Sequence, residues 1–150
     1  MLFRSHMARI KLTLPERELT SVEIPLRITD LNYGNHLGHD SLVSLLHEAR
    51  VQWLTSAGYS EMNVEGSTLI LSGLFVEFTG EAFYGDRLRI TLFAGEAFKF
   101  GFEIYYKAEA FRGGEIVSIG KARTDMVFFD YATRKILGMP ELFREKYFHS

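Results

Sequence analysis

The chain has 150 residues, a formal net charge of -2 and 47% apolar residues, which fit one globular domain spanning residues 1–150. Lys and Arg are scattered rather than gathered in blocks, which argues against a nucleic-acid partner, and the absence of cysteine excludes disulfides, thiolate catalysis and cysteine-bound zinc. No apolar run reaches membrane-spanning length and no secretory apolar segment is present, so we expect a cytoplasmic protein that does not bind membranes.

The N-terminal part of the chain is expected to contain two short strands. Residues 1–6 resemble a cloning remnant or an early start ahead of a second methionine, and we exclude them from fold reasoning. Residues 8–14 and 21–28 have strand-like composition. Pro15 and Pro25 confine these strands to sheet edges or strand ends, because proline cannot donate a ladder hydrogen bond.

Residues 40–57 form the one long predicted helix. Asp40 can cap its start and Gly58 ends it. The polar residues of this helix occupy only a narrow stripe of its surface, so we expect a largely enclosed helix. Arg50 falls inside the apolar arc and is expected to pair with an acid at a buried contact. The apolar residues of the arc recur at helical spacing: Leu42, Val43, Leu45, Leu46, Ala49, Trp53 and Leu54.

Four strand-like runs follow the helix, at residues 68–79, 86–97, 100–111 and 115–129. We predict that they form an antiparallel meander and that residues 140–147 close the chain with a short helix or turn. One long apolar helix and four long strands each need the other to bury an apolar face. The sequence therefore favours an α+β fold in which a strongly curved antiparallel sheet wraps around one long central helix.

The loop before this helix concentrates the chemically useful side chains. Asp30, Asn32 and His36 lie in the loop, and Glu48 follows on the polar stripe of the helix. A helix N-terminus has backbone N–H groups without intrahelical partners and a partial positive charge, so it can polarise a carbonyl oxygen or hold an anion. Carboxylate, imidazole and oxyanion donors can therefore meet at this junction.

Three segments of the sequence match a known family. They are RITDLNYGNHLGH at residues 27–39, HEAR at residues 47–50 and GKARTDMVFFDYATRK at residues 120–135, which leads to Pro140. In these segments the chain resembles the hotdog-fold acyl thioesterases, which include 4-hydroxybenzoyl-CoA thioesterase, bacterial acyl-CoA thioesterases and plant acyl-ACP thioesterases. The resemblance extends over nearly the whole chain and implies the hotdog fold, a curved antiparallel sheet around a central helix.

The resemblance also implies an activity and an assembly. It implies hydrolysis of an acyl-CoA or acyl-ACP thioester, with no cofactor other than the coenzyme A of the substrate. It implies a homodimer in which two sheets join edge to edge and each site draws residues from both subunits, often with dimers paired into a tetramer. The aromatic-rich strands at residues 98–106 and 127–129 fit contact with a neighbour, or simply fill the interior of the sheet.

The loop departs from the family pattern at specific positions. In the acyl-ACP branch it usually reads Asp-Leu-Asp-x-Asn-x-His-x-Asn-Asn, and Asp30 and His36 match this pattern. Asn32 stands where the family has its second acid, Gly34 stands at the first Asn, and Gly38 with the following histidine replaces the Asn-Asn pair. In the 4-hydroxybenzoyl-CoA branch an Asp of this loop acts as nucleophile or base, and Asp30 is its nearest counterpart. The identity of the working carboxylate stays open.

Thioester hydrolysis needs a group that attacks or activates water and donors for the oxyanion. We expect Glu48 or Asp30 to supply the carboxylate and His36 to orient the reactants or carry a proton. Asn32 is a candidate ligand for water or for the carbonyl oxygen. The candidate oxyanion donors are the backbone N–H groups at the helix start, those of Leu37, Gly38, His39 and Asp40.

Most of these residues also have a purely structural interpretation. Asp30 and Asn32 can bond the backbone of their own turn. Asp40 is a better candidate for a helix cap than for a catalyst. His39 is a better candidate for a partly exposed neighbour of the site than for a catalytic residue. Glu48 is either solvated or directed to a cleft or a partner subunit.

The sequence lacks the motifs of other hydrolase classes. His36, His39 and Asp40 carry side chains that bind zinc, but their spacing lies in a loop and the HExxH pattern is missing, so we expect no metal. The Gly-x-Ser-x-Gly elbow, the P-loop and the Gly-x-Gly-x-x-Gly fingerprint are also missing.

Two alternative functions stay open. Hotdog hydratases and dehydratases of enoyl or 3-hydroxyacyl thioesters use the pattern Asp-x-Asn-Pro-x-His, which residues 30–36 resemble without the proline and with the histidine one residue farther on. A catalytically silent acyl-thioester binding protein is favoured by Asn32 and Gly34, which replace the acid and the Asn of the family. Water addition to an enoyl-CoA, or binding without turnover, would identify these alternatives.

Overall fold

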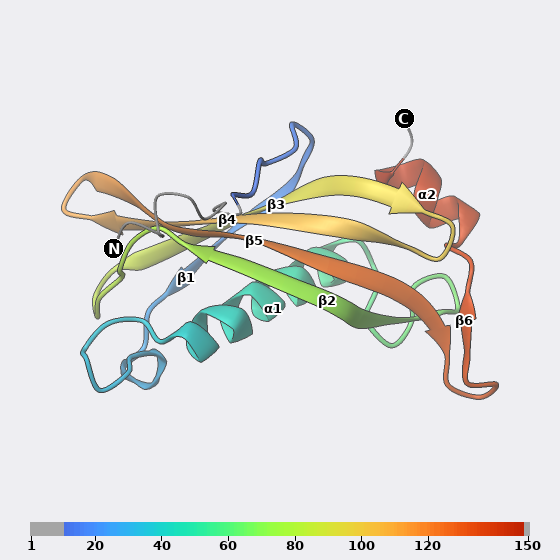
Figure 1. Cartoon of the computed structure of the whole chain (residues 1–150), viewed down its shortest axis with the longest axis horizontal. Coiled ribbons are helices and arrows are strands. Elements are labelled where there is room, and N and C mark those ends of the chain that lie inside the picture. Colours follow the sequence, from blue (N-terminus) through green and yellow to red (C-terminus); the bar gives the residue numbers. More distant parts are fainter. Residues whose placement is uncertain (1–10, 149–150) are drawn as a thin grey trace, which may run out of the picture.

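One antiparallel sheet and a single long helix make up most of the structure, a computed structural model that describes residues 11–148 (Figure 1). In space the strands follow the order β1-β3-β4-β5-β2, and β6 pairs with β5. The predicted α+β fold with one central helix is confirmed. In chain order the elements are β1 (Glu18–Pro25), the 3-10 helix η2 (Ile28–Asp30), α1 (His39–Ser56), β2 (Thr68–Phe78), β3 (Arg87–Phe98), β4 (Gly101–Arg112), β5 (Glu115–Asp130), β6 (Lys135–Leu137) and α2 (Glu141–Tyr147).

The predicted meander is correct for β3, β4 and β5 but wrong for β2. β2 pairs with β5, with Phe75 opposite Arg123, whereas β3 pairs with β1, with Val22 opposite Ile90. The chain passes through α1 between β1 and β2, and Figure 1 shows α1 along one face of the sheet. The first two strands therefore become the two outer edges of the sheet, on either side of the helix.

Residues 11–17 lie on the face of the sheet opposite α1 (Figure 1). The backbone N–H of Leu12 donates to Glu77 Oε1 at 3.1 Å, and Lys121 Nζ donates to the Leu12 carbonyl oxygen at 3.4 Å. The Leu12 side chain is buried. Side chains of β2 and β5 hold this segment on the sheet at Leu12, and the Ala94 N–H of β3 donates to the Arg17 carbonyl oxygen at 2.9 Å.

Both predicted N-terminal strands need correction. The strand predicted at residues 8–14 is absent from residue 11 onward, because side chains bind the backbone there. The rest of it, like the possible remnant at residues 1–6, lies outside the described residues. The strand predicted at residues 21–28 is shifted toward the N-terminus and ends at Pro25, which lacks the N–H that would continue the ladder.

Helix α1 begins one residue earlier than predicted. Gly38, in an extended conformation, is the N-cap, so Asp40 lies within the first turn and does not cap the helix. Gly58, with φ of +84°, follows the C-terminal end as predicted. The polar stripe, including Glu48, is exposed, so the helix is enclosed on one side rather than largely enclosed. The buried side consists of Leu42, Leu45, Leu46, Ala49, Arg50, Trp53 and Leu54.

The buried Arg50 pairs with an acid, as predicted, although that acid, Glu61, is partly exposed. The Arg50 Nε lies 3.0 Å from Glu61 Oε2, and a terminal N–H donates to the Tyr106 hydroxyl at 3.0 Å. Tyr106 lies 2.7 Å from the Thr124 hydroxyl, and both residues are buried. Burial raises the pKa of Tyr106, which keeps the hydroxyl protonated beside the guanidinium. This network links the middle of α1 to β4 and β5.

Aromatic side chains close the core at the C-terminal end of α1. Trp53 packs edge-on against Phe143 of α2, with ring centroids 6.1 Å apart. Phe143 also contacts Phe102 and Phe128 at 5.2 and 5.6 Å. These aromatic side chains fill the core at this end, whereas the other end of the helix borders an open cleft.

Candidate active site

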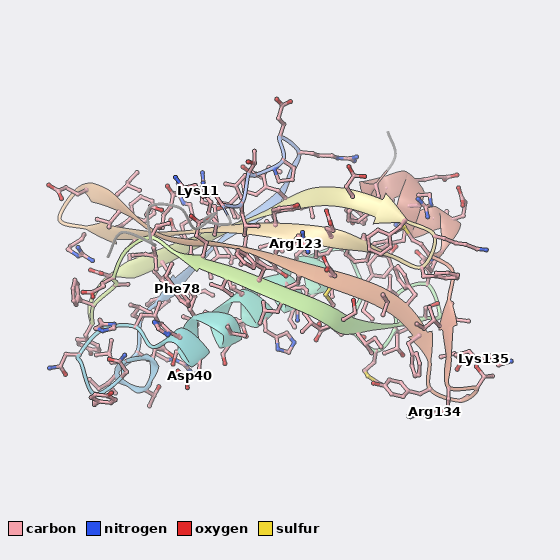
Figure 2. All side chains as sticks on the ribbon, in the orientation of Figure 1. Lys11, Asp40, Phe78, Arg123, Arg134 and Lys135 are labelled. Carbon is pink, nitrogen blue, oxygen red and sulfur yellow. The ribbon has the colours of Figure 1, made fainter. Side chains whose placement is uncertain are left out.

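A cleft of about 210 Å³ opens beside the N-terminus of α1. Figure 2 shows Phe78, at the end of β2, and Asp40, in the first turn of α1, at the same end of the molecule. We call this hollow the α1 cleft. It is lined by the loop before α1, by the helix start, by β5 and by the chain that leaves β2: His36, Leu37, Gly38, His39, Leu42, Phe78, Gly80, Glu81, Ala82 and Ile119.

His36 lines the cleft with one ring nitrogen already engaged. Its Nδ1 lies 3.2 Å from the carbonyl oxygen of Leu37. Because a carbonyl oxygen can only accept a hydrogen bond, this contact assigns the proton to Nδ1 and leaves Nε2 with a free lone pair. The Leu37 N–H donates to the Ala82 carbonyl at 2.8 Å, which fastens the loop to the chain that follows β2. In the neutral ring that makes this hydrogen bond, Nε2 is the nitrogen that can accept a proton.

Backbone N–H groups at the start of α1 border the same cleft. Those of Leu37 and Gly38 donate to the carbonyl oxygens of Ala82 and Asp30, so the structure does not support the prediction that they are oxyanion donors. The N–H groups of His39 and Asp40 come next in the first turn and have no acceptor among residues 11–148. Of the four proposed donors, these two have free N–H groups, and His39 is the one of the two that lines the α1 cleft.

Asp30 and Asn32 serve the local turn rather than the cleft. The buried Asp30 carboxylate accepts the Arg27 backbone N–H at 2.8 Å and pairs with its guanidinium at 3.2 Å. Asn32 Oδ1 accepts the Gly34 N–H at 2.9 Å. Neither residue lines the α1 cleft. The contacts of Asp30 and Asn32 are therefore those of residues that stabilise their own turn.

Glu48 lies away from the cleft, in a second hollow between β1 and the exposed side of α1. It accepts a hydrogen bond from Gln52 at 2.7 Å. Nine residues of helix separate it from His39, a rise of about 13 Å. The hollow, of about 440 Å³, shares no residue with the α1 cleft and is lined by Glu23, Ile24, Pro25, Arg27, Ser44, Leu45, Glu48 and Gln52.

Glu81 is the carboxylate that lines the α1 cleft, and it lies outside every motif recognised in the sequence. The chain that carries it is braced by Arg112, which donates to the Glu81 carbonyl at 3.0 Å and to Asp86 at 2.8 Å. Asp86 also accepts the Phe83 N–H at 2.8 Å. The hydrogen bond from Arg112 lowers the pKa of Asp86, although burial opposes the shift.

The same region does not form a metal site in the described residues. Among residues 11–148, no group of three or more His, Asp or Glu side chains is arranged to hold a metal ion. His36 and His39 border one cleft, but the His39 ring packs on Phe78 with centroids 4.2 Å apart. The arrangement therefore combines a proton acceptor, free N–H donors and a carboxylate around an apolar hollow.

Comparisons with known proteins agree with this fold. A sequence profile of the thioesterase-like superfamily matches residues 26–147, so the chain belongs to that superfamily. No significant match was found among curated proteins. Neither helix within residues 11–148 is long and apolar enough to cross a membrane.

Several solved structures share the hotdog fold. The 4-hydroxybenzoyl-CoA thioesterase from Pseudomonas sp. strain CBS-3 superposes with a TM-score of 0.75 at 16% identity, over 86% of this chain and 98% of its own. The 1,4-dihydroxy-2-naphthoyl-CoA thioesterase from Synechocystis gives 0.70 at 21% identity, over 83% and 91%. A thioesterase superfamily protein from Jannaschia sp. CCS1 gives 0.77 at 14% identity, over 89% and 83%.

Proposed function

We propose that the protein is an acyl thioesterase that hydrolyses an acyl-CoA or acyl-ACP thioester in the α1 cleft. The observation that carries the proposal is the position of His36. Its Nε2 is free to accept a proton, and its ring borders the same cleft as the first free N–H groups of α1. Membership of the thioesterase-like superfamily and two neighbours named as acyl-CoA thioesterases support the same reaction class.

The proposed reaction uses groups of this chain alone. The thioester carbonyl oxygen accepts a hydrogen bond from the N–H group of His39, at the start of α1, where the helix dipole favours negative charge. His36 Nε2 takes a proton from the attacking water as the new carbon–oxygen bond forms. When the carbon–sulfur bond breaks, that proton passes to the sulfur, and the products are a carboxylic acid and the free thiol.

Glu81 is the carboxylate we assign to this mechanism. Asp30 is committed to Arg27, and Glu48 borders the other hollow, whereas Glu81 lines the α1 cleft with His36. Across the cleft, an ionised Glu81 stabilises the imidazolium that His36 forms when it accepts the proton. The sequence suggested Asp30 or Glu48 for this role, and we propose Glu81 in their place.

The proposed assembly is a homodimer joined through β2. The outer edge of β2 pairs with no strand in residues 11–148, and Leu71 and Leu74 are about half exposed along it. A long apolar edge strand is a site for pairing with another chain. Since Phe78 belongs both to β2 and to the α1 cleft, a partner at this edge would lie beside the site. The absence of cysteine fits a reducing cytoplasm as the compartment.

Thiol release from a panel of short, medium, long and aromatic acyl-CoAs, with acyl-ACPs included, tests the proposed activity. Hydrolysis of at least one member supports it. Water addition to an enoyl-CoA without thiol release would instead indicate a hydratase. Binding of acyl-CoA without any turnover would indicate the silent binder, which the Asn at position 32 favours, and would contradict the proposal.

A further inference from the structure

We infer that Arg112, at the end of β4, is a positioning residue of the proposed active site. Arg112 does not line the α1 cleft. It acts on the segment at residues 80–82, which carries the Glu81 carboxylate and is bonded to the loop of His36, and so sets how these two groups face each other. The inference rests on the proposed function, because it concerns the geometry of that site.

The Arg112 guanidinium binds two parts of the connection between β2 and β3 at once. Its Nε and Nη2 donate to the two carboxylate oxygens of Asp86 at 3.2 and 2.8 Å, and Nη2 also donates to the Glu81 carbonyl oxygen at 3.0 Å. Asp86 is 5% exposed and accepts the Phe83 N–H at 2.8 Å, so the carboxylate is fixed within its own turn. The guanidinium also lies over the Phe83 ring, 4.7 Å from its centroid. Arg112 is therefore anchored on a buried acid and holds the Glu81 carbonyl from that anchor.

The Glu81 carbonyl lies between two other attachments of the same segment. On one side, the Gly80 N–H donates to a carbonyl oxygen of β5 at 3.2 Å, and a Cβ atom at this position would collide with another β5 carbonyl oxygen. On the other side, the Ala82 carbonyl oxygen accepts an N–H of the loop before α1 at 2.8 Å. The bond from Arg112 fixes the peptide plane that joins Glu81 to Ala82. This plane restricts both the direction of the Glu81 side chain and that of the Ala82 carbonyl.

The same segment fastens the loop of His36. The Leu37 N–H donates to the Ala82 carbonyl oxygen at 2.8 Å, and the Leu37 carbonyl oxygen lies 3.2 Å from His36 Nδ1. Hydrogen bonds and single peptide units therefore connect Arg112 to both polar groups of the cleft. Without Arg112 the Glu81 peptide can turn, and the carboxylate and the imidazole lose their fixed arrangement. A misplacement of about 1 Å can lower the rate of an enzyme about 100-fold.

Arg89 provides a matched control on the neighbouring strand β3. It also pairs with a carboxylate, that of Glu23 at 3.3 Å, and it also lies over an aromatic ring, 4.5 Å from the centroid of Phe111. Its side chain is 42% exposed, close to the 38% of Arg112. Arg89 lies outside the α1 cleft. Replacing either arginine with alanine therefore removes an ion pair and a ring contact, and replacing Arg112 also removes the bond to the Glu81 carbonyl.

Steady-state thiol release, with a melting curve for each variant, tests the inference. Arg112→Ala should lower kcat about 10-fold or more and change KM by less than about threefold, because the arginine lies outside the cleft. Arg112→Lys keeps a charge beside Asp86 but cannot reproduce the planar fork, so it should regain melting temperature and little of kcat. Arg89→Ala should keep the wild-type kcat. A folded Arg112→Ala variant with the wild-type kcat would overturn the inference.

A double variant shows whether Arg112 acts through Glu81. Glu81→Gln removes the charge whose position Arg112 sets, so Arg112→Ala should lower kcat by less than about threefold in that background. A merely structural arginine would lower kcat by the same factor in both backgrounds. A decrease as large as in the wild-type background would therefore overturn the inference.

Hydrogen exchange of the Leu37 amide separates this inference from the proposed function, because it needs no turnover. This amide should exchange about tenfold faster in Arg112→Ala than in the wild type, and at the wild-type rate in Arg89→Ala. Faster exchange in a protein that releases no thiol from any acyl-CoA would contradict the hydrolase and support the role of Arg112 in fixing the segment. Thiol release by the wild type, with unchanged exchange and kcat in Arg112→Ala, would support the hydrolase and overturn the positioning role.

Discussion

The Tyr106 hydroxyl is a buried polar group that depends on its hydrogen-bond partners. It is buried, and it contacts both the Arg50 guanidinium and the Thr124 hydroxyl. A buried polar group that loses its partner costs more than the net value of the hydrogen bond, because it has also lost water. The network therefore stabilises the fold only while all of its members are present.

Tyr106→Phe should lower the free energy of unfolding by about 1–3 kcal/mol, since it leaves Arg50 and Thr124 each without one partner. Urea denaturation monitored by Trp53 fluorescence measures the change. Tyr105→Phe is the matched control: Tyr105 is the adjacent residue of β4, is half-buried on the other face of the sheet, and shares a hydrogen bond with Arg123, which is partly exposed, so its removal should cost less. Equal losses in the two variants would argue against a special role for the buried network.

Single residues of the loop show how contacts decide between two interpretations of one motif. Asp30 and His36 both match the family pattern, yet the carboxylate is paired with Arg27 while the imidazole borders the cleft. The sequence predicted that these side chains gather near the helix start. The sequence did not predict the ion pair between Arg27 and Asp30, because this pair depends on the local 3-10 turn.

At the scale of elements, the chain between β2 and β3 positions one side of the cleft. Asp86 binds Arg112 and the Phe83 N–H, and Arg112 in turn holds the Glu81 carbonyl. Because the hydrogen bond from Arg112 lowers the pKa of Asp86 in the folded protein, Asp86 stabilises the fold when it is ionised.

The unfolding free energy should therefore depend on pH through Asp86. The contribution is complete above about pH 5, where the folded and unfolded states are both ionised. As the pH falls through the unfolded pKa of about 3.9 toward the lower folded pKa, the unfolded state takes up the proton first and the contribution is lost. Denaturation at pH 7 and pH 3 should show a smaller decrease for Asp86→Asn than for the wild type.

The pH experiment has a matched control in Glu145→Gln, which removes an exposed carboxylate of α2. This variant should keep the wild-type difference between pH 7 and pH 3. If Asp86→Asn also keeps it, the ion pair does not contribute to acid stability.

Elements differed in how far the sequence could predict them. α1 was predicted within one residue at each end, because helical spacing of apolar residues is a local signal. The strand that pairs with β2 was not predicted, because the pairing with β5 joins segments about fifty residues apart in the sequence. Glu81 and Ile119 reach the cleft through this same pairing, so no local motif marks them. β6, with three residues, is too short to produce a periodic pattern.

At the scale of the whole molecule, the open edge of β2 is the proposed dimer interface. Leu74, 45% exposed on this strand, should be buried by a partner. A lysine at an edge strand opposes pairing with another chain. Leu74→Lys should therefore convert a dimer into a monomer, as measured by analytical ultracentrifugation.

Leu142→Lys provides the control for this prediction, because Leu142 is 57% exposed but lies on α2. It should remain dimeric. A wild-type chain that sediments as a monomer, or a Leu74→Lys variant that remains dimeric, would contradict an interface at β2.

The proposed enzyme hydrolyses a thioester in the α1 cleft with His36 as the proton acceptor. The most direct test is kcat/KM for thiol release from the acyl-CoA of the panel that the wild type hydrolyses fastest, measured for the wild type, His36→Ala, Glu81→Gln and the control Glu48→Gln, each with a melting curve. We expect His36→Ala and Glu81→Gln to stay folded and lose about 100-fold or more, while Glu48→Gln keeps its activity. A folded His36→Ala variant with the wild-type rate would contradict the claim.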